Sequence, residues 1–271
     1  MKRYLIIALC LLLCFAAGCT PQDNSDPANT DTNTGTDADT DTGTDADTDT
    51  GGDTGQQPET PDSPPWAIGP DDVTPPADPP WVREPREDKP LNDLIVNTIQ
   101  ITITMETGGV IVAELYPDVA PQTVRNFVYL ARLGFYDGLK FHRIMTGFMV
   151  QGGCPLGTGT GNAGYSIWGE FSENGFTNDI RHVRGVLSTA RGDDYNSAGS
   201  QFFIVHDSSP HLNTKYAAFG RVISGMEVVD EIAATPNSGD NGAVADEDMP
   251  VIRSITVDDD IELPPPEKLP R

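Results

Sequence analysis

The chain has 271 residues, and its formal net charge of −24 is distributed unevenly. Residues 1–19 carry +2, residues 20–90 carry −15 and residues 91–271 carry −11. A nucleic-acid binder needs a basic face to neutralise phosphates, so this composition argues against that class of protein. Beyond the polar N-terminal part, about 170 residues remain, which is enough for one full hydrophobic core.

The N-terminus is typical of an export signal. Two basic residues precede an apolar run at residues 4–15, and small residues then lead to Cys19. This layout predicts a cleaved signal peptide over residues 1–18, and the run is too short to span a membrane. The sequence Ala-Ala-Gly-Cys at 16–19 resembles the bacterial lipobox, although Ala16 stands where that motif more often has Leu. The resemblance implies a lipid anchor on Cys19, with release as a soluble protein as the alternative.

A disordered stalk is predicted after the lipidated cysteine, within residues 19–90. Residues 20–57 contain no Val, Ile, Leu, Met, Phe, Trp or Tyr, so they cannot offset the entropy cost of ordering. The octad TGTDADTD occurs at 34–41 and again at 42–49. Its alternating Asp residues resemble a calcium loop, but the Gly and Glu that an EF-hand requires are Thr here, which favours a solvated spacer. Eleven prolines in residues 58–90 predict a stiffer, semi-extended second half.

The remaining sequence predicts a mainly β domain. Residues 95–105 and 110–115 are β-rich, and Glu-Thr-Gly-Gly between them predicts a hairpin. Pro121 opens a helical pattern, Gly134 follows its end, and a second helix is expected at 226–233. Further short apolar strands are expected near 141–144, 148–151, 186–189, 202–205, 217–223 and 251–257.

Many short strands at irregular intervals, with two helices, predict a closed eight-stranded antiparallel β-barrel capped by the helices. We expect this domain to cover residues 91–260 and a Pro-rich tail to follow at 261–271.

The sequence lacks the signatures of several common types of binding and catalytic site. Residues 157–164 contain a literal G-x-G-x-x-G, but no helical pattern follows, so a glycine-rich surface loop is predicted instead of a dinucleotide site. The four histidines lack metal-ligand spacing, and no G-x-S-x-G occurs. Cys154, the single cysteine of the folded region, has no Cys-His signature around it and is interpreted as structural. We therefore expect no metal and no cofactor.

Four sequence segments carry a family resemblance. They read APQTVRNF at 120–127, FHRIMTGFMVQGG at 141–153, SQFFI at 200–204 and FGRV at 219–222. In this order and at these separations they closely resemble the cyclophilin-type peptidyl-prolyl cis/trans isomerases, over residues 99–257. The resemblance implies that the chain binds proline-containing polypeptides and accelerates rotation about X-Pro bonds.

Carried over by position, the resemblance makes Arg143 the catalytic guanidinium, Phe148 part of the proline pocket and Gln151 the neighbour of the substrate backbone. It also implies substrate contacts for the remaining matching positions, His142, Met149, Ala190, Gln201, Phe203, His211, Leu212 and Tyr216.

Two of these positions depart from the best-known eukaryotic members. His211 occupies a position that is Trp there, and Tyr216 one that is His. The loop at 191–199 looks like the bacterial branch of the family. These differences imply only weak cyclosporin binding.

The residue types suit the reaction. Resonance opposes rotation about a peptide bond by about 18–20 kcal/mol, and no covalent bond needs to break. Catalysis needs only a site that binds the twisted amide better than the planar forms, and an Arg presents a fixed fork of donors that a Lys lacks.

We therefore expect a bacterial, monomeric, membrane-anchored lipoprotein outside the cytoplasm. It would act as an isomerase and folding helper on unfolded or exported chains. A non-catalytic proline-binding module on a membrane stalk is the alternative.

Overall fold

The chain divides into two units, residues 1–56 and 57–271, and the computed structural model describes residues of the second unit only. The predicted signal peptide and Cys19 lie outside the described residues, as does the predicted stalk apart from Asp78 and Pro79. No helix in the described part is long and apolar enough to cross a membrane. The residues that the structure describes are 78–79, 93, 95–239, 241–257 and 260–271.

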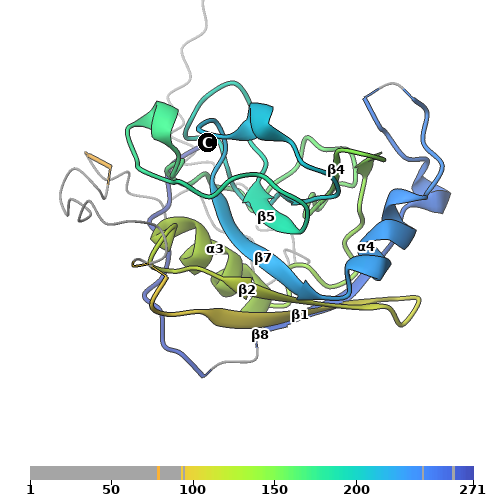
Figure 1. The fold of residues 1–271 in the computed structure, drawn as a ribbon, viewed down its shortest axis with the longest axis horizontal. Helices are drawn as coiled ribbons and strands as arrows, with labels where there is room; N and C mark the ends of the chain where they lie inside the picture. Colours follow the sequence, from red (N-terminus) through yellow and green to blue (C-terminus); the bar gives the residue numbers. More distant parts are fainter. Residues whose placement is uncertain (1–77, 80–92, 94, 240, 258–259) are drawn as a thin grey trace, which may run out of the picture. The chain divides into compact units, whose positions relative to one another are not determined.

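Eight strands and two α-helices make up the domain (Figure 1). Each of the predicted strands and both predicted helices are confirmed, with boundaries that shift by two residues or fewer except at the start of the first strand. In chain order, the elements are β1 (Ile99–Met105), β2 (Val110–Leu115), α3 (Pro121–Arg132), β3 (Arg143–Met145), β4 (Met149–Gly152), β5 (Val186–Thr189), β6 (Phe202–Val205), β7 (Ala218–Ser224), α4 (Met226–Ala233) and β8 (Ile252–Val257).

The strands form one antiparallel sheet in the order β3-β4-β6-β5-β7-β2-β1-β8. The sheet curls into an open half-barrel, so the prediction of a closed barrel is corrected: β3 and β8 are its two edges. The physical reason is that a different segment occupies the outer edge of β3. Ile144 N–H donates to Gly242 O at 2.7 Å, and Val244 N–H donates to His142 O at 3.2 Å. The loop before β8 therefore takes the hydrogen bonds that closure would need.

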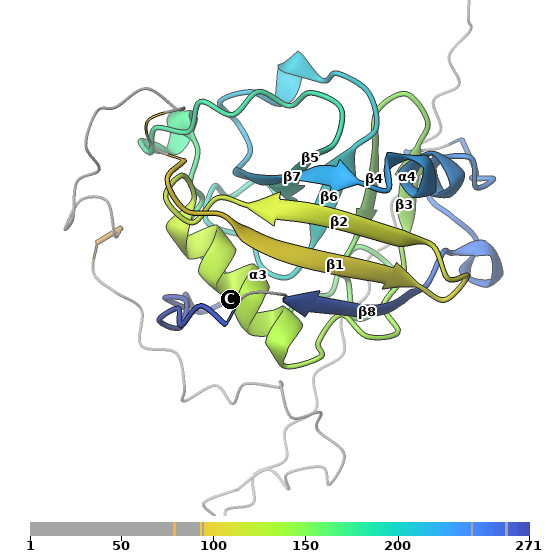
Figure 2. The same ribbon diagram turned by 60° about the horizontal axis from the view of Figure 1, so that its bottom comes forward.

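The core lies inside the curl and under the helices. Alternate residues of β1 are buried, as the two-residue period of a strand requires. Figure 2 shows α3 lying across one end of the sheet and α4 at the other. On α3, the ring of Phe127 packs within 5.0–5.3 Å, between centroids, of the rings of Tyr136, Phe202 and Phe219. This aromatic cluster joins α3 to β6 and β7, the strands that lead into the site.

The N-terminus of α3 is capped from a distant part of the chain. The carboxylate of Glu170, which is 1% exposed, accepts hydrogen bonds from the backbone N–H groups of Gln122 and Thr123, both at 2.9 Å. These donors have no partner within the helix, and a carboxylate is favoured there by the helix dipole.

The predicted Pro-rich tail packs against the domain. Arg132 Nη2 of α3 donates to Ile261 O at 2.6 Å. Further along, the backbone N–H of Glu267 donates to Gln122 Oε1 at 2.9 Å. The segment after residue 260 thus runs along α3 from its C-terminal end to its N-terminal end.

Candidate active site

A small pocket opens between β4, β6 and the loops beside them. It has a volume of about 120 Å³. For comparison, an apolar cavity of roughly 150 Å³ can hold benzene, so this pocket is of the size of a single small ring. Its lining combines apolar side chains with two guanidinium groups and one amide: Arg143, Phe148, Met149, Gln151, Ala190, Arg191, Phe203, Leu212 and Tyr216.

The strand register explains why residues far apart in sequence meet here. Arg143 of β3 lies opposite Gln151 of β4, and Gln151 lies opposite Phe203 of β6. Directly opposed residues on neighbouring antiparallel strands project to the same face. A row of cation, amide and aromatic ring therefore crosses three strands.

Aromatic contacts fix the walls of the pocket. Phe203 is only 4% exposed, and its ring stacks on His182 at 6.0 Å and meets Tyr216 edge-on at 5.9 Å. On the opposite side, the ring of Phe148 lies 5.2 Å from that of His211. Because both rings are held by neighbours, the pocket is preformed.

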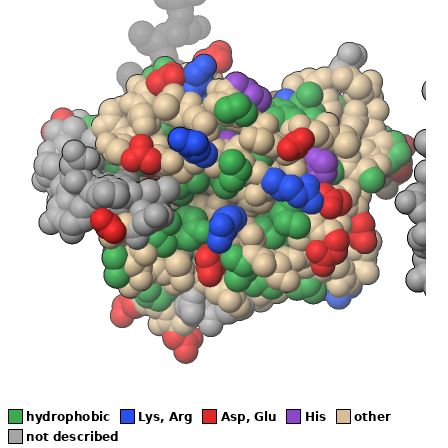
Figure 3. Space-filling view, in the orientation of Figure 1, with side chains coloured by type: hydrophobic (Ala, Val, Ile, Leu, Met, Phe, Trp, Pro, Cys, Tyr) green, Lys and Arg blue, Asp and Glu red, His purple; other side chains and the backbone are tan. Residues whose placement is uncertain are grey.

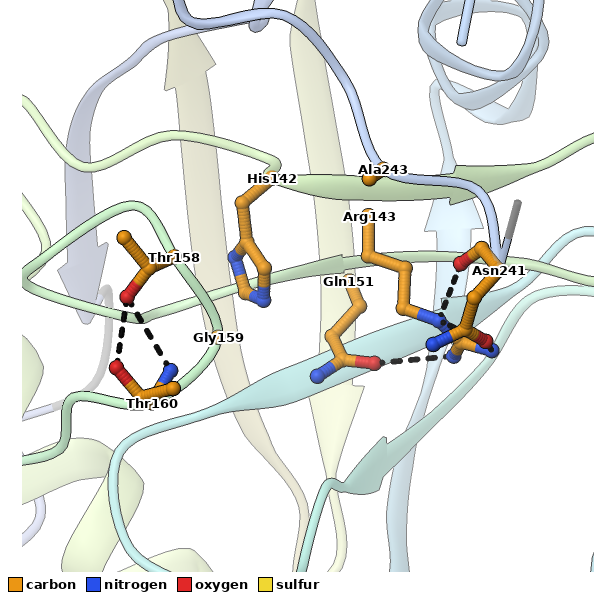
Figure 4. Close-up of a pocket in the computed structure, with 8 residues that line it drawn as sticks. All are labelled: His142, Arg143, Gln151, Thr158, Gly159, Thr160, Asn241 and Ala243. Atoms are coloured by element: carbon orange, nitrogen blue, oxygen red, sulfur yellow. Dashed lines mark hydrogen bonds between the residues drawn. The ribbon is translucent and has the colours of Figure 1, made fainter. Parts of the chain in front are cut away.

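The guanidinium of Arg143 is held from two sides (Figure 4). Its Nη1 donates to Gln151 Oε1 at 3.3 Å. Asn241, on the loop before β8, accepts through its backbone oxygen from Nε at 2.8 Å and through Oδ1 from Nη2 at 2.7 Å. Partial burial lowers the pKa of Arg143, but a guanidinium remains cationic at neutral pH. The site therefore presents a fixed positive charge beside an apolar pocket.

A chain of amide groups continues from Arg143 along the groove. Gln151 Nε2 donates to Gln201 Oε1 at 3.0 Å, and Gln201 Nε2 donates to the carbonyl oxygens of Gly159 and Gly161 at 2.7 and 2.8 Å. The glycine-rich loop predicted at 157–164 is thus tied to the floor of the site.

His142 borders this region. Figure 4 shows its ring between Gln151 and the loop that carries Thr158 and Thr160. The ring is 6% exposed, and burial lowers the pKa of His142, so it is neutral at pH 7. The ring supplies a polar wall without a second charge.

The structure brings the predicted site residues together. Eight of them line the pocket, and the other three lie beside it: His142 and Gln201 next to Gln151, and His211 against Phe148.

Sequence reasoning missed two residues of the site, Arg191 and Asn241. Asn241 precedes a glycine and adopts φ 55°, which is typical of an Asn-Gly turn, yet no local signal links it to Arg143, 98 residues away.

Comparisons with known proteins agree with this geometry. The family described as "Cyclophilin type peptidyl-prolyl cis-trans isomerase/CLD" matches residues 101–257. Peptidyl-prolyl cis-trans isomerase B of Bacillus subtilis is 54% identical over 124 residues, which are 45% of this chain and 82% of the relative. Peptidyl-prolyl cis-trans isomerase-like 3 of Gallus gallus is 46% identical over 138 residues, 50% of this chain and 84% of the relative.

A solved structure shares the fold. The cyclophilin type peptidyl-prolyl cis-trans isomerase of Cryptosporidium parvum, crystallised in the presence of the dipeptide Ala-Pro, aligns with a TM-score of 0.53 and 30% identity. The alignment covers 59% of this chain and 99% of that one. Because the family model matches more than half of this chain, the chain belongs to the cyclophilin-type peptidyl-prolyl cis-trans isomerases.

Proposed function

We propose that Arg143 is the catalytic residue of this isomerase and that the adjoining pocket binds the proline ring. The observation that carries the proposal is the guanidinium of Arg143 held by Asn241 and Gln151 at the rim of an apolar pocket. The crystallisation of a 30% identical relative in the presence of Ala-Pro supports a proline-containing ligand.

The mechanism follows from the electronic change in the amide. As the C–N bond twists, conjugation is lost and the lone pair of the proline nitrogen becomes a hydrogen-bond acceptor. Arg143 donates to this lone pair only in the twisted state, so it lowers the barrier without stabilising either planar isomer. Each 1.36 kcal/mol gained in this way gives a tenfold increase in rate.

The other residues bind the two sides of the rotating amide bond separately. Phe203, Met149 and Leu212 enclose the ring and exclude water, which strengthens the hydrogen bond from Arg143. Gln151 is placed to bind the substrate backbone on the side of the groove. The acyl side of the amide can then turn while the ring stays fixed.

Replacing Arg143 tests the proposal. We expect Arg143→Ala to lower kcat/KM for an X-Pro peptide by about 10²–10³-fold, as for the loss of one preorganised donor. Arg143→Lys keeps the charge but not the fork, and should recover only part of the rate. Rates would be measured by NMR exchange, with Arg184→Ala, an exposed Arg paired with Asp230, as the matched control.

An Arg143→Ala protein that is folded and as fast as the wild type would contradict the assignment. A wild type that binds the peptide without accelerating it would instead identify a non-catalytic proline-binding module.

We also propose that the enzyme is a bacterial lipoprotein that acts outside the cytoplasm on unfolded or exported chains. The supporting features are the lipobox-like residues 16–19 and the acidic, Pro-rich segment after Cys19. Several acyl chains on one cysteine would meet the two-signal requirement for stable anchoring. Mass spectrometry of the mature N-terminus tests this: an unmodified N-terminus with a free Cys19 thiol would exclude the anchor.

A further inference from the structure

The last residues of the chain are fixed on the domain. Leu269 pairs with Ser166 through two backbone hydrogen bonds, Leu269 N–H to Ser166 O at 2.8 Å and Ser166 N–H to Leu269 O at 3.0 Å. Lys268 Nζ lies over the rings of Tyr129 and Tyr165, at 4.8 and 5.0 Å from their centroids. Because Leu269 is only 9% exposed, this pairing is part of the packed surface. The position of the following residues is therefore determined by the fold.

This anchoring brings Arg271 to the substrate groove. A second pocket, with a volume of about 170 Å³, lies beside the proline pocket and is lined by Arg271 together with Gln201 and Arg191. The two pockets share Gln151, Ala190 and Arg191. Among the described residues, the guanidinium of Arg271 makes a single long hydrogen bond, to a backbone oxygen at 3.5 Å. Its other donors have no protein acceptor within the described part of the chain.

Arg191 supplies a second cation at this pocket, and it is rigid. Its Cζ lies 4.8–5.0 Å from the centroids of three aromatic rings, and its Nε donates to the backbone oxygen of Lys215 at 3.0 Å. Asp193 and Asp194 follow it in the chain, but both are exposed and line neither pocket. Neither Arg191 nor Arg271 belongs to an ion pair found within the described part of the chain.

The sign of charge in the groove is opposite to that of the protein. Residues 91–271 carry −11, yet no Asp or Glu lines the proline pocket or the pocket of Arg271. Figure 3 shows one face of the domain, on which Lys, Arg and His side chains lie toward the middle with acidic side chains among and around them. A cationic hollow in an acidic surface attracts and orients an anionic group.

We propose that Arg271 is a specificity-determining residue that, with Arg191, selects proline-containing chains carrying a carboxylate side chain two or three residues from the proline. The inference rests on the proposed function of the proline pocket. The spacing follows from the shared lining of the two pockets, because an extended chain advances only about 3.3 Å per residue. A carboxylate in the second pocket can accept from the fork of Arg271 and lies near the fixed charge of Arg191.

Peptide pairs test this inference. Each pair has one proline and carries either Glu or Gln at a single position, two or three residues before or after the proline. We expect kcat/KM for the Glu peptide to exceed that for the Gln peptide by about threefold to tenfold at one of these positions, as for a partly exposed charged hydrogen bond. The ratio should fall toward one in Arg271→Ala and at high ionic strength. In Arg271→Glu it should reverse in favour of a Lys peptide.

Arg253→Ala is the matched control, because Arg253 is exposed on β8 and pairs with Glu106. This variant should keep the wild-type ratio. A wild type that accelerates isomerisation of both peptides equally at every position and binds them equally tightly, or a preference for Glu that persists in Arg271→Ala, overturns the inference. Peptide affinities from NMR titration separate it from the proposed function: tighter binding of the Glu peptide that depends on Arg271 would support the inference even if no rate enhancement were found.

Discussion

The loop that carries Asn241 offers the sharpest test of how the site works. Asn241 contacts the guanidinium through two different oxygens: the backbone oxygen, 2.8 Å from Nε, and Oδ1, 2.7 Å from Nη2 and 3.2 Å from Nε. Asn241→Gly removes the side chain, and with it the contacts of Oδ1, but keeps the backbone oxygen. Glycine also accepts the φ of 55° found there without strain, so the backbone contact should remain.

The expected loss of transition-state stabilisation in Asn241→Gly follows from the strength of the hydrogen bond that is removed. A hydrogen bond to a charged group contributes about 1.5–3 kcal/mol, and a partly exposed one lies at the lower end. Since Arg143 keeps the backbone oxygen of Asn241 and Gln151, we expect a loss of about 1–1.5 kcal/mol in the twisted state. This corresponds to a roughly fivefold to tenfold lower kcat. KM should not change, because the lone-pair contact of Arg143 exists only in the transition state.

NMR exchange spectroscopy on an X-Pro peptide over a range of peptide concentrations would separate kcat from KM. Asn241→Asp keeps an oxygen at the same place and should retain most of the rate. Thermal unfolding of both variants would show that the fold is intact. An Asn241→Gly protein with unchanged kcat, or with equal losses in Asn241→Asp, would refute the view that this side chain positions the guanidinium.

Two further predictions concern the walls of the pocket. His182 is buried between Ser188 and Asn213, and burial lowers the pKa of His182 to about 4. The unfolded chain binds a proton below about pH 6.5, while the folded state binds it only near pH 4. The contribution of His182 to stability is therefore full above pH 6.5 and should fall by about 1.4 kcal/mol per pH unit toward pH 4. His182→Gln should lose this dependence. The free energy of unfolding would be measured by urea titration of both proteins at pH 7 and at pH 5. An equal change between the two pH values in the wild type and in His182→Gln would contradict the prediction. At the rim, His211→Trp should tighten cyclosporin binding, because an indole beside Phe148 adds apolar area and a donor; calorimetry giving an unchanged Kd would count against this.

Local pattern was sufficient to predict most of the fold. The hairpin at 95–115 follows from alternation and a glycine turn, and the helix at 226–233 follows from its spacing of apolar residues. Closure of the barrel could not be predicted in this way. It depends on which segment reaches the edge of β3, and the residues that do so, 242–244, have no strand-like pattern.

The residues of the site also fall into those that local sequence predicts and those that it does not. Arg143, Gln151 and Phe203 were predicted because each belongs to a segment that resembles the family, and the strand register then places them in one row. Asn241 and Arg271 lie outside those segments and act through tertiary placement: a left-handed turn in one case and the packing of the tail in the other.

The pairing of residues 242–244 with the edge of β3 also bears on how this isomerase handles its ligands. An exposed strand edge beside the pocket would be a template on which an unfolded chain could add a strand, with main-chain hydrogen bonds that are slow to release. Here residues 242–244 already pair with that edge through two backbone hydrogen bonds, and an added Cβ at Gly242 would overlap the carbonyl of Ile144, so this pairing requires a glycine. We therefore expect a bound polypeptide to be held here by side-chain contacts and not by strand addition at this edge.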